Sequence, residues 1–385
     1  METLNKIETQ KGLNEVVTNK VHNMIKMNAA SVTAVLQRLM YEGSLAKDFL
    51  APIGTNMVAI DRNPEITFSA NGHVQMFMNN NMYSLNSNAV SQLGEKMDIP
   101  AKYLRNLAEG DEWKRRLCAT TLNEYSSWTN KKRVLIRTVG DQVRGVLSDS
   151  YRRLNAVSIV TAFLQEVEKQ NAAVSNAYMN DTKIWCETLL PMPIEIPTPN
   201  NGIVTIFAGA RFSTSDYGDG SVDMRSYLLN GACLNGMVRE TVMKQIHLGG
   251  KLPEHIALSE ETYRLDTETT ASAVRDLTSN LYSSDTIKAK AFEIQRASEV
   301  EVDMTQELSS LIKKGSLLKS EGKEVETILM NNNPNDGVSG AATLWKLTQG
   351  ITAFGRNCEL QDDPKRAREL HELSGELMNR VNVKS

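Results

Sequence analysis

The sequence is short of cysteine and has no long apolar run, and both absences limit what the protein can be. Only four cysteines occur among 385 residues, and they are far apart with no CxxC pair. This usage fits a reducing cytosol and gives no zinc-site spacing. No apolar stretch approaches the roughly 18 residues of a membrane span, and the N-terminus lacks the apolar core of a signal peptide. We therefore expect a cytoplasmic protein without a membrane partner.

Motifs that carry catalytic chemistry are also absent. The sequence has no GxxxxGKS or GxxxxGKT phosphate loop, and Gly218-Asp-Gly220 lacks the third glycine of a dinucleotide fingerprint. It has no GxSxG or HExxH motif, and its five histidines are scattered. Asp216, Asp219 and Asp223 cluster near a glycine-rich turn, but their spacing does not match a calcium loop. We expect no enzyme, no cofactor and no metal, and keep a metal-dependent nuclease at these aspartates as the last alternative.

Charge is distributed unevenly along the chain. The net charge is −3, yet the segment 113–153 holds ten basic and three acidic residues, a local +7 that leaves −10 for the remainder. A basic region on an acidic body suits phosphate binding. Acids from elsewhere in the fold would neutralise the same charges equally well, so both interpretations stay open at this point.

The centre of the basic segment has the pattern of a β-hairpin. Residues 133–148 (RVLIRTVGDQVRGVLS) form two alternating runs separated by Gly140-Asp141, which predicts a two-residue loop. The predicted register pairs Thr138 with Val143, Ile136 with Gly145 and Val134 with Leu147 on an apolar face. On the other face it places Arg137 directly opposite Arg144. Because like charges directly opposite are destabilising, this pair requires an anion, either a carboxylate of the protein or a phosphate.

Basic and aromatic residues also alternate on two later strand candidates. Lys183, Trp185 and Glu187 share one face of the first, and Arg225 and Tyr227 share a face of the second. This pattern suits single-stranded nucleic acid if these strands share a sheet with the hairpin, whereas a solvated sheet face gives the same pattern. The predicted nucleic-acid-binding residues are Lys131, Lys132, Arg133, Arg137, Arg144, Tyr151, Arg152, Arg153, Trp185, Arg225 and Tyr227.

The order of the expected elements predicts an α+β fold rather than βαβ repetition. We expect a mainly antiparallel sheet with flanking helices and a mostly helical C-terminal region. The expected domains are an N-terminal helical arm (1–50), an α+β core domain (51–250) and a helical C-terminal domain (251–385).

Individual elements follow from periodicity and turn residues. Expected strands cover 65–78, 183–190, 202–213 and 222–233. Expected helices are two within 1–50, two short ones within 86–109, then 112–124, 155–170, two or three within 254–314, 341–354 and 364–381. Ser87 or Asn88 is expected to cap the first short helix, and Pro100 to lie in the first turn of the second. The prolines of 191–199 should keep that stretch out of a central ladder.

Five segments together carry a family resemblance. They are 84–107 (SLNSNAVSQLGEKMDIPAKYLRNL), 134–138 (VLIRT), 143–155 (VRGVLSDSYRRLN), 227–238 (YLLNGACLNGMV) and 343–354 (TLWKLTQGITAF), and they resemble the phage/plasmid-like protein family, a domain of unknown function found in phages, prophages and plasmids. The arginine that the family has just before the cysteine of its second block is replaced here by Leu229-Asn230-Gly231. The hairpin–helix–strand order is more distantly similar to phage single-strand annealing proteins.

The resemblance implies a role in replication, recombination or host takeover, and it brings no catalytic residues. The first hypothesis is a phage- or plasmid-encoded protein that binds single-stranded DNA in the bacterial cytoplasm and anneals strands in recombination. The second is an interaction protein that inhibits or redirects a host replication or recombination protein through its acidic helical C-terminal half. Because annealing requires a strand to be held over many nucleotides, we expect a homo-oligomer, assembled through the apolar stripes of 12–41 or 266–312.

Overall fold

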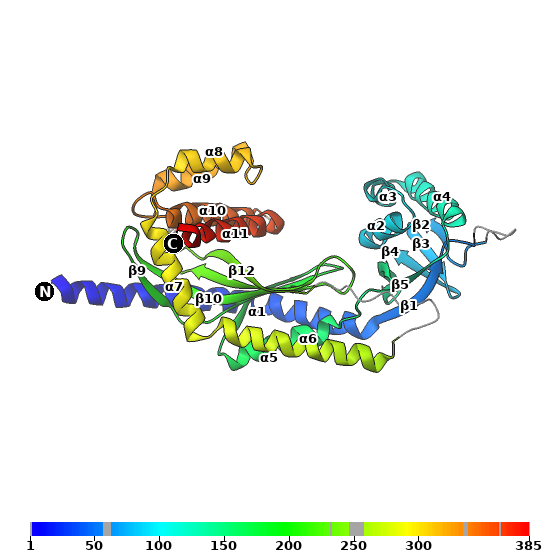
Figure 1. The fold of residues 1–385 in the computed structure, drawn as a ribbon, viewed down its shortest axis with the longest axis horizontal. Coiled ribbons are helices and arrows are strands. Elements are labelled where there is room, and N and C mark those ends of the chain that lie inside the picture. Colours follow the sequence, from blue (N-terminus) through cyan, green and yellow to red (C-terminus); the bar gives the residue numbers. More distant parts are fainter. Residues whose placement is uncertain are drawn as a thin grey trace.

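A computed structural model describes residues 2–56, 63–231, 233–245, 258–333, 338–361 and 363–384. It confirms the α+β class: two mostly antiparallel sheets are flanked by helices, and the C-terminal region is helical (Figure 1). Within these residues, no helix is long and apolar enough to cross a bilayer. The three-domain division stays a prediction.

The N-terminal region is one long helix, α1 (Glu2–Leu45), where the sequence predicted two. The prediction was wrong because no Gly or Pro interrupts the chain between Gly12 and Gly43, so nothing ends the first helix. Val17, Val21, Val32 and Leu39 are buried in contacts with the rest of the chain. Much of the apolar stripe expected to drive self-association is therefore used within the molecule, whereas Val16 (54% exposed) and Met40 (59% exposed) are not buried by it.

The first sheet has the strand order β1-β5-β6-β4-β3-β2. Its strands are β1 (Ala46–Ile53), β2 (Thr67–Asn71), β3 (His73–Met78), β4 (Asn81–Leu85), β5 (Lys132–Val139) and β6 (Gln142–Ser148). The single strand predicted over 65–78 is in fact the β2–β3 hairpin, which turns at Gly72 with a φ of 70°. Glycine takes this left-handed conformation without the penalty that a side chain imposes.

Three helices cover one face of the first sheet: α2 (Ser87–Lys96), α3 (Ala101–Ala108) and α4 (Glu112–Trp128) (Figure 1). All three were predicted. The N-cap of α2 is Asn86 rather than Ser87 or Asn88, since its side chain accepts a hydrogen bond from the Ala89 backbone N–H at 2.8 Å. Pro100 is the N-cap residue of α3 rather than part of its first turn.

The second sheet has the strand order β12-β11-β10-β8-β7, with β9 paired to the start of β10. Its strands are β7 (Ala173–Met179), β8 (Ile184–Leu189), β9 (Ile194–Thr198), β10 (Gly202–Thr214), β11 (Val222–Asn230) and β12 (Asn235–Gln245). Strands β8, β10 and β11 were predicted, whereas β7 and β12 were missed. The proline-rich stretch stays out of the central ladder, as predicted, but it forms the short strand β9.

Helices pack on both sides of the second sheet (Figure 1). α5 (Ala156–Lys169) and α6 (Glu260–Leu281) lie on one side, and α10 (Leu344–Leu360) and α11 (Pro364–Met378) on the other. The remaining helices are α7 (Ser284–Glu299), α8 (Met304–Lys313), α9 (Lys319–Asn331) and a short 3₁₀ helix (Asn379–Lys384). Asn155 caps α5 as predicted, since its side chain accepts from Ser158 N at 3.2 Å. The stripe of 266–312 is filled too, because Val274, Leu281, Leu308 and Leu311 are buried in the chain's own cores.

Candidate nucleic-acid interface

The basic hairpin is present as β5 and β6, joined by Gly140-Asp141. Thr138 pairs with Val143 as predicted, but the pairing then shifts by one residue. A β-bulge places Arg144 between the pairs, so Arg137 lies opposite Gly145, Ile136 opposite Val146 and Val134 opposite Ser148. The predicted opposition of Arg137 and Arg144 is therefore wrong. The extra residue sends the two guanidinium groups to different partners.

Arg137 is neutralised by the neighbouring strand. Asp48 of β1 is its cross-strand partner, and the Arg137 Nε donates to Asp48 Oδ1 at 2.8 Å. A second guanidinium nitrogen donates to the backbone oxygen of Asp216 at 2.7 Å, and only 11% of the side chain is exposed. Burial raises the pKa of Asp216 above its usual value, although Arg137 opposes this shift. The sequence did not decide whether a protein carboxylate or a phosphate balances Arg137. In the structure, the anion is a carboxylate of the protein, that of Asp48.

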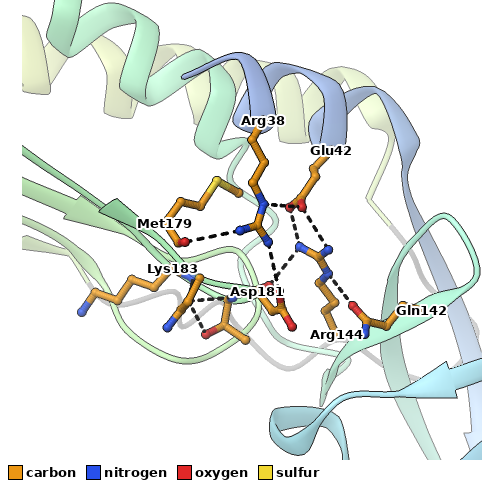
Figure 2. Close-up of polar contacts among 9 residues, drawn as sticks. Arg38, Glu42, Gln142, Arg144, Met179, Asp181 and Lys183 are labelled. Atoms are coloured by element: carbon orange, nitrogen blue, oxygen red, sulfur yellow. Dashed lines mark hydrogen bonds and ion pairs between the residues drawn. The ribbon is translucent and has the colours of Figure 1, made fainter. Parts of the chain in front are cut away.

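Arg144 is buried at a junction of three elements (Figure 2). Its guanidinium group forms a two-point ion pair with Glu42 near the end of α1, and its Nε donates to Gln142 Oε1 at 2.9 Å. Arg38 also donates to Glu42, at 2.8 Å, and reaches Asp181 in the β7–β8 turn at 3.0 Å. Burial alone would raise the pKa of Glu42, but the hydrogen bonds from Arg144 and Arg38 hold this pKa below its usual value. Arg144 thus connects α1, the hairpin and the second sheet.

Three further predicted arginines also have carboxylate partners. The pairs are Arg133 with Asp149 at 3.2 Å, Arg152 with Asp266 at 2.5 Å, and Arg225 with Asp223 at 2.8 Å and with Glu372 at 2.9 Å. Arg153 has no ion pair with any described carboxylate. Its guanidinium carbon lies 4.6 Å from the ring centroid of Tyr263, and it lines a separate cavity of about 600 Å³ with Lys47 and Arg264.

The remaining predicted residues do not form one surface. Lys131 and Lys132 are exposed, and Lys131 pairs with Glu65 at 2.8 Å. Tyr227 is buried, and the half-buried Tyr151 donates its hydroxyl to the Ser215 backbone oxygen at 3.3 Å. The hairpin belongs to the first sheet, whereas Trp185, Arg225 and Tyr227 belong to the second. The alternating strand pattern supports one continuous nucleic-acid groove only if these strands share a sheet with the hairpin. They lie in a different sheet, so the pattern does not support such a groove.

Trp185 nevertheless lies in an arrangement suited to nucleic acid. It faces Tyr178 across the β7–β8 ladder, with ring centroids 5.3 Å apart and an interplanar angle of 38°. Trp185 is half-buried, and Tyr178 is 44% exposed. Arg368 of α11 lies over both rings, 4.3 Å from the Trp185 centroid and 5.3 Å from that of Tyr178, while the Lys183 Nζ lies 5.2 Å from the Trp185 centroid. We call these four residues the aromatic–cation patch.

The two cations of the patch differ from the hairpin arginines. Neither Lys183 nor Arg368 forms an ion pair with a carboxylate among the residues that the structure describes. Burial lowers the pKa of Lys183, and the more distant Asp219 and Asp223 oppose this only in part. Burial, followed by the neighbouring Arg211, lowers the pKa of Arg368. Both cations are thus held against aromatic faces, and carboxylates such as Asp219 and Glu187 act on them only from beyond ion-pair distance in the described part of the chain.

Local sequence explains how the patch is built. The β7–β8 turn is fixed by Asn180, whose side-chain oxygen accepts from the backbone N–H groups of Thr182 at 2.9 Å and Lys183 at 2.8 Å. In Figure 2, the Lys183 side chain extends away from the Arg144–Glu42 pair. On α11, the buried Ala367, Leu370 and His371 face the interior, which leaves Arg368 at the margin of the helix.

A cleft of about 1090 Å³ adjoins the patch. Tyr178 and Asn180 line its second-sheet wall, and His73, Asn88 and Arg105 line the wall formed by the first sheet and its helices. One ring of the patch therefore opens into a space between the two sheets.

The aspartates of the glycine-rich turn have separate partners. Asp216 accepts from Ala156 N at 3.0 Å, Asp219 accepts from the Thr182 hydroxyl at 2.7 Å, and Asp223 pairs with Arg225. In the described ranges, no three His, Cys, Asp or Glu side chains come together as metal ligands.

Sequence reasoning found Trp185 but missed Tyr178 and Arg368. Alternation in AVSNAYM (Ala173–Met179) is a usable strand signal that was overlooked. No local signal marks Arg368, because only the packing of α11 on the second sheet brings it to Trp185.

No family model matches this chain, and no curated protein or solved structure matches it either. The resemblance to phage and plasmid proteins stays a prediction.

Proposed function

We propose that this protein binds single-stranded DNA at the aromatic–cation patch. Bases stack on aromatic faces irrespective of sequence, and cations beside the rings hold the phosphates between successive bases. Tyr178 and Trp185 supply two neighbouring rings, and Lys183 and Arg368 supply the charges. The hairpin arginines are left out of the interface because carboxylates of the chain already bind them.

The proposal rests on one observation: Lys183 and Arg368 form no ion pair with a carboxylate in the described part of the chain. Half-buried cations without a carboxylate partner pay a desolvation penalty that an incoming phosphate relieves. Within the described part of the chain, Lys183 and Arg368 lie on adjacent rings and have no carboxylate within ion-pair distance. The cleft of about 1090 Å³ that begins at Tyr178 offers an extended strand a continuation past the patch. Strand annealing by a phage- or plasmid-encoded protein is the finer form of the proposal, and it rests on the sequence resemblance.

The test is a titration of a fluorescein-labelled single-stranded oligonucleotide, read by anisotropy. Trp185→Ala is expected to weaken binding by about 1–3 kcal/mol, the usual contribution of one stacked base. The flanking Ile184 and Cys186 are buried on the opposite side of the strand, so the core remains intact. Acceleration of annealing between complementary oligonucleotides, measured with the same variants, tests the finer form.

Trp113→Ala is the matched control. Trp113 is 57% exposed and also has a lysine over its ring, Lys114 at 5.6 Å, but it lies on α4, away from the patch. Its removal should leave the affinity unchanged. Equal affinity of the wild type and Trp185→Ala, with both folded, would remove the patch from any DNA-binding site.

A further inference from the structure

A cavity of about 600 Å³ lies where α5, α6 and the start of β1 meet, and none of its lining residues belongs to the aromatic–cation patch. Its size falls within the roughly 300–1,000 Å³ of small-molecule sites. Five basic and three acidic side chains line it, so its local charge is +2: Lys47, Arg137, Arg153, Arg264 and Arg275, and Asp48, Glu260 and Glu268. A hollow with this excess of positive charge favours an anionic ligand.

Most of the excess belongs to cations that are free to bind a ligand. Two of the five are neutralised within the chain, by the pairs Arg137–Asp48 and Arg264–Glu268. Three others form no ion pair with a carboxylate in the described part of the chain: Lys47, Arg153 and Arg275. Glu166 of α5 attracts Arg275 only from beyond ion-pair distance. Of the lining acids, Glu260 alone is left without an ion pair among the described residues, so two positive charges remain unbalanced.

Arg153 is the cation whose surroundings point most directly to a ligand. Its guanidinium carbon lies 4.6 Å from the ring centroid of Tyr263, which holds the group in place without neutralising it. Its Nε is buried, and none of its guanidinium nitrogens has a hydrogen-bond partner among the described residues. Because buried donors are nearly always partnered, this arrangement indicates an acceptor that the described residues do not supply.

Neutral donors lie beside these cations. Asn155 and Ser158, at the beginning of α5, both line the cavity. The side-chain oxygen of Asn155 accepts from the Ser158 backbone N–H at 3.2 Å, which leaves the amide N–H groups of Asn155 free to donate to a ligand. The cavity therefore offers several hydrogen-bond donors together with its unbalanced positive charge.

We propose that this cavity binds a phosphate monoester, such as the terminal phosphate of a nucleotide. A phosphate monoester carries a charge of about −1.5 to −2 at pH 7 and three strong acceptor oxygens on one atom, which matches a local charge of +2. A planar guanidinium group such as that of Arg153 donates to two of these oxygens at once. A phosphodiester of the DNA backbone carries a single negative charge and leaves part of the excess unbalanced. The site is separate from the DNA-binding patch proposed above and does not depend on it.

Equilibrium dialysis of the full chain against radiolabelled deoxyadenosine 5′-monophosphate tests the proposal. The methyl ester of the same nucleotide differs by one methyl group and one negative charge, and it should bind about tenfold more weakly. Succinate, a dianion whose charges lie on two separate groups, should compete poorly with the nucleotide. Equal binding of the nucleotide and its methyl ester, or equally strong competition by succinate, would overturn the proposal.

Arg153→Gln tests the residue on which the site depends. Loss of its charged hydrogen bonds should lower the affinity for the nucleotide about tenfold or more. Lys323→Gln is the matched control, because it removes the same charge from an exposed position on α9 that does not line the cavity. This control should bind as the wild type does. Unchanged affinity in a folded Arg153→Gln would remove the cavity from consideration as a phosphate site.

Tyr263 is a positioning residue, since it acts through Arg153. Tyr263→Leu removes the ring face against which the guanidinium group lies and should weaken nucleotide binding several-fold. Tyr263→Phe keeps the ring and should restore the wild-type affinity. Equal affinity of the wild type and Tyr263→Leu would contradict this role.

Two further measurements identify the source of the phosphate and separate this site from the patch. An oligonucleotide with a 5′-phosphate should displace the labelled nucleotide more strongly than the same oligonucleotide with a 5′-hydroxyl if the cavity takes DNA ends. Equal displacement by the two would assign the cavity to free nucleotides, and either result supports a phosphate monoester. Trp185→Ala should keep full affinity for the nucleotide, so failure of the patch and failure of the cavity are distinguishable. Absence of nucleotide binding by the wild type would overturn the proposal outright.

Discussion

The hairpin of the first sheet and the β7–β8 edge of the second sheet both carry basic residues, yet the fold uses these residues differently. Arg137 and Arg144 lie against Asp48 and Glu42, carboxylates from β1 and α1. Lys183 and Arg368 lie against aromatic rings. A high density of basic residues in the sequence therefore does not identify a binding site. The group that lies next to each cation in the fold, carboxylate or aromatic ring, is the better indicator.

The hairpin arginines connect elements that are distant in sequence. Arg144 reaches α1 across 102 positions, Arg137 reaches β1 across 89, and Arg152 reaches α6 across 114. A planar guanidinium group binds a carboxylate at two points and so fixes orientation as well as distance. These arginines orient the first sheet, α1 and the second sheet relative to one another. We therefore expect substitutions of the hairpin arginines to lower the stability of the fold, and substitutions in the aromatic–cation patch to weaken the binding of single-stranded DNA.

The largest expected effect is on stability at Arg144. Arg144→Ala leaves Glu42 buried with only part of its neutralisation, and breaking a buried pair in this way costs about 3–5 kcal/mol. Urea unfolding followed by circular dichroism should show a lower midpoint, while oligonucleotide affinity per folded molecule stays unchanged. Arg264→Ala, which removes an exposed arginine paired with Glu261 and Glu268 on α6, should lower the unfolding midpoint far less, because exposed ion pairs contribute little to stability. If Arg144→Ala kept its stability but lost its DNA affinity, Arg144 would belong to the DNA-binding site and would not have the structural role assigned to it.

The second effect is on the salt dependence of DNA binding. In Lys183→Gln/Arg368→Gln both cations of the patch are lost, and charged hydrogen bonds contribute about 1.5–3 kcal/mol each. The slope of log affinity against log salt should shrink by about 1.4, since each lost phosphate contact on a single strand removes about 0.7. The control Arg264→Gln/Lys323→Gln removes the same charge from exposed positions on α6 and α9. An equal loss of slope in both double variants would mean that net charge, rather than the patch, controls binding.

Much of the local structure was predictable, because it depends on residues close in sequence. The Asn155 cap, the two-residue hairpin loop and the helices around α4 follow from turn residues and periodicity. The bulge at Arg144 was not predictable, since the alternating pattern reads equally well with or without one extra residue. This single residue changes which side chains face one another along the whole strand.

The sequence could not show which cations pair with carboxylates of the chain, for a different reason. Glu42 was seen only as part of a helix, and nothing in the sequence brings it to Arg144. Arg368 reaches Trp185 only through the docking of α11 on the second sheet. A sequence can therefore identify cations and rings, but the choice between an internal carboxylate and an external phosphate is made by tertiary packing.

A smaller effect concerns acid pH at the hairpin junction. The pKa of Glu42 is held below its usual value by Arg144 and Arg38, against burial, so its ionised form stabilises the folded state. A lowered folded-state pKa gives stability that is present above the unfolded value of about 4.3 and is lost as pH falls through the folded value. Glu42→Gln should therefore be less stable than the wild type at pH 7. The difference in the free energy of unfolding should narrow steadily below about pH 4.3, and a constant difference would show that the charge of Glu42 is not what matters.

The smallest expected effect separates ring stacking from hydrogen bonding at Tyr178. The rings of Tyr178 and Trp185 adjoin at 5.3 Å, and the proposed contact with a base uses the ring face rather than the hydroxyl. Tyr178→Phe should therefore bind oligonucleotide as the wild type does, whereas Tyr178→Ala should lose about 1–3 kcal/mol. Because Tyr178 lies on an edge strand and is 44% exposed, neither change should lower stability much. Titration of both variants at one salt concentration decides the point. A loss in Tyr178→Phe equal to that in Tyr178→Ala would mean that the hydroxyl makes the contact, and the stacking basis of the patch would have to be abandoned.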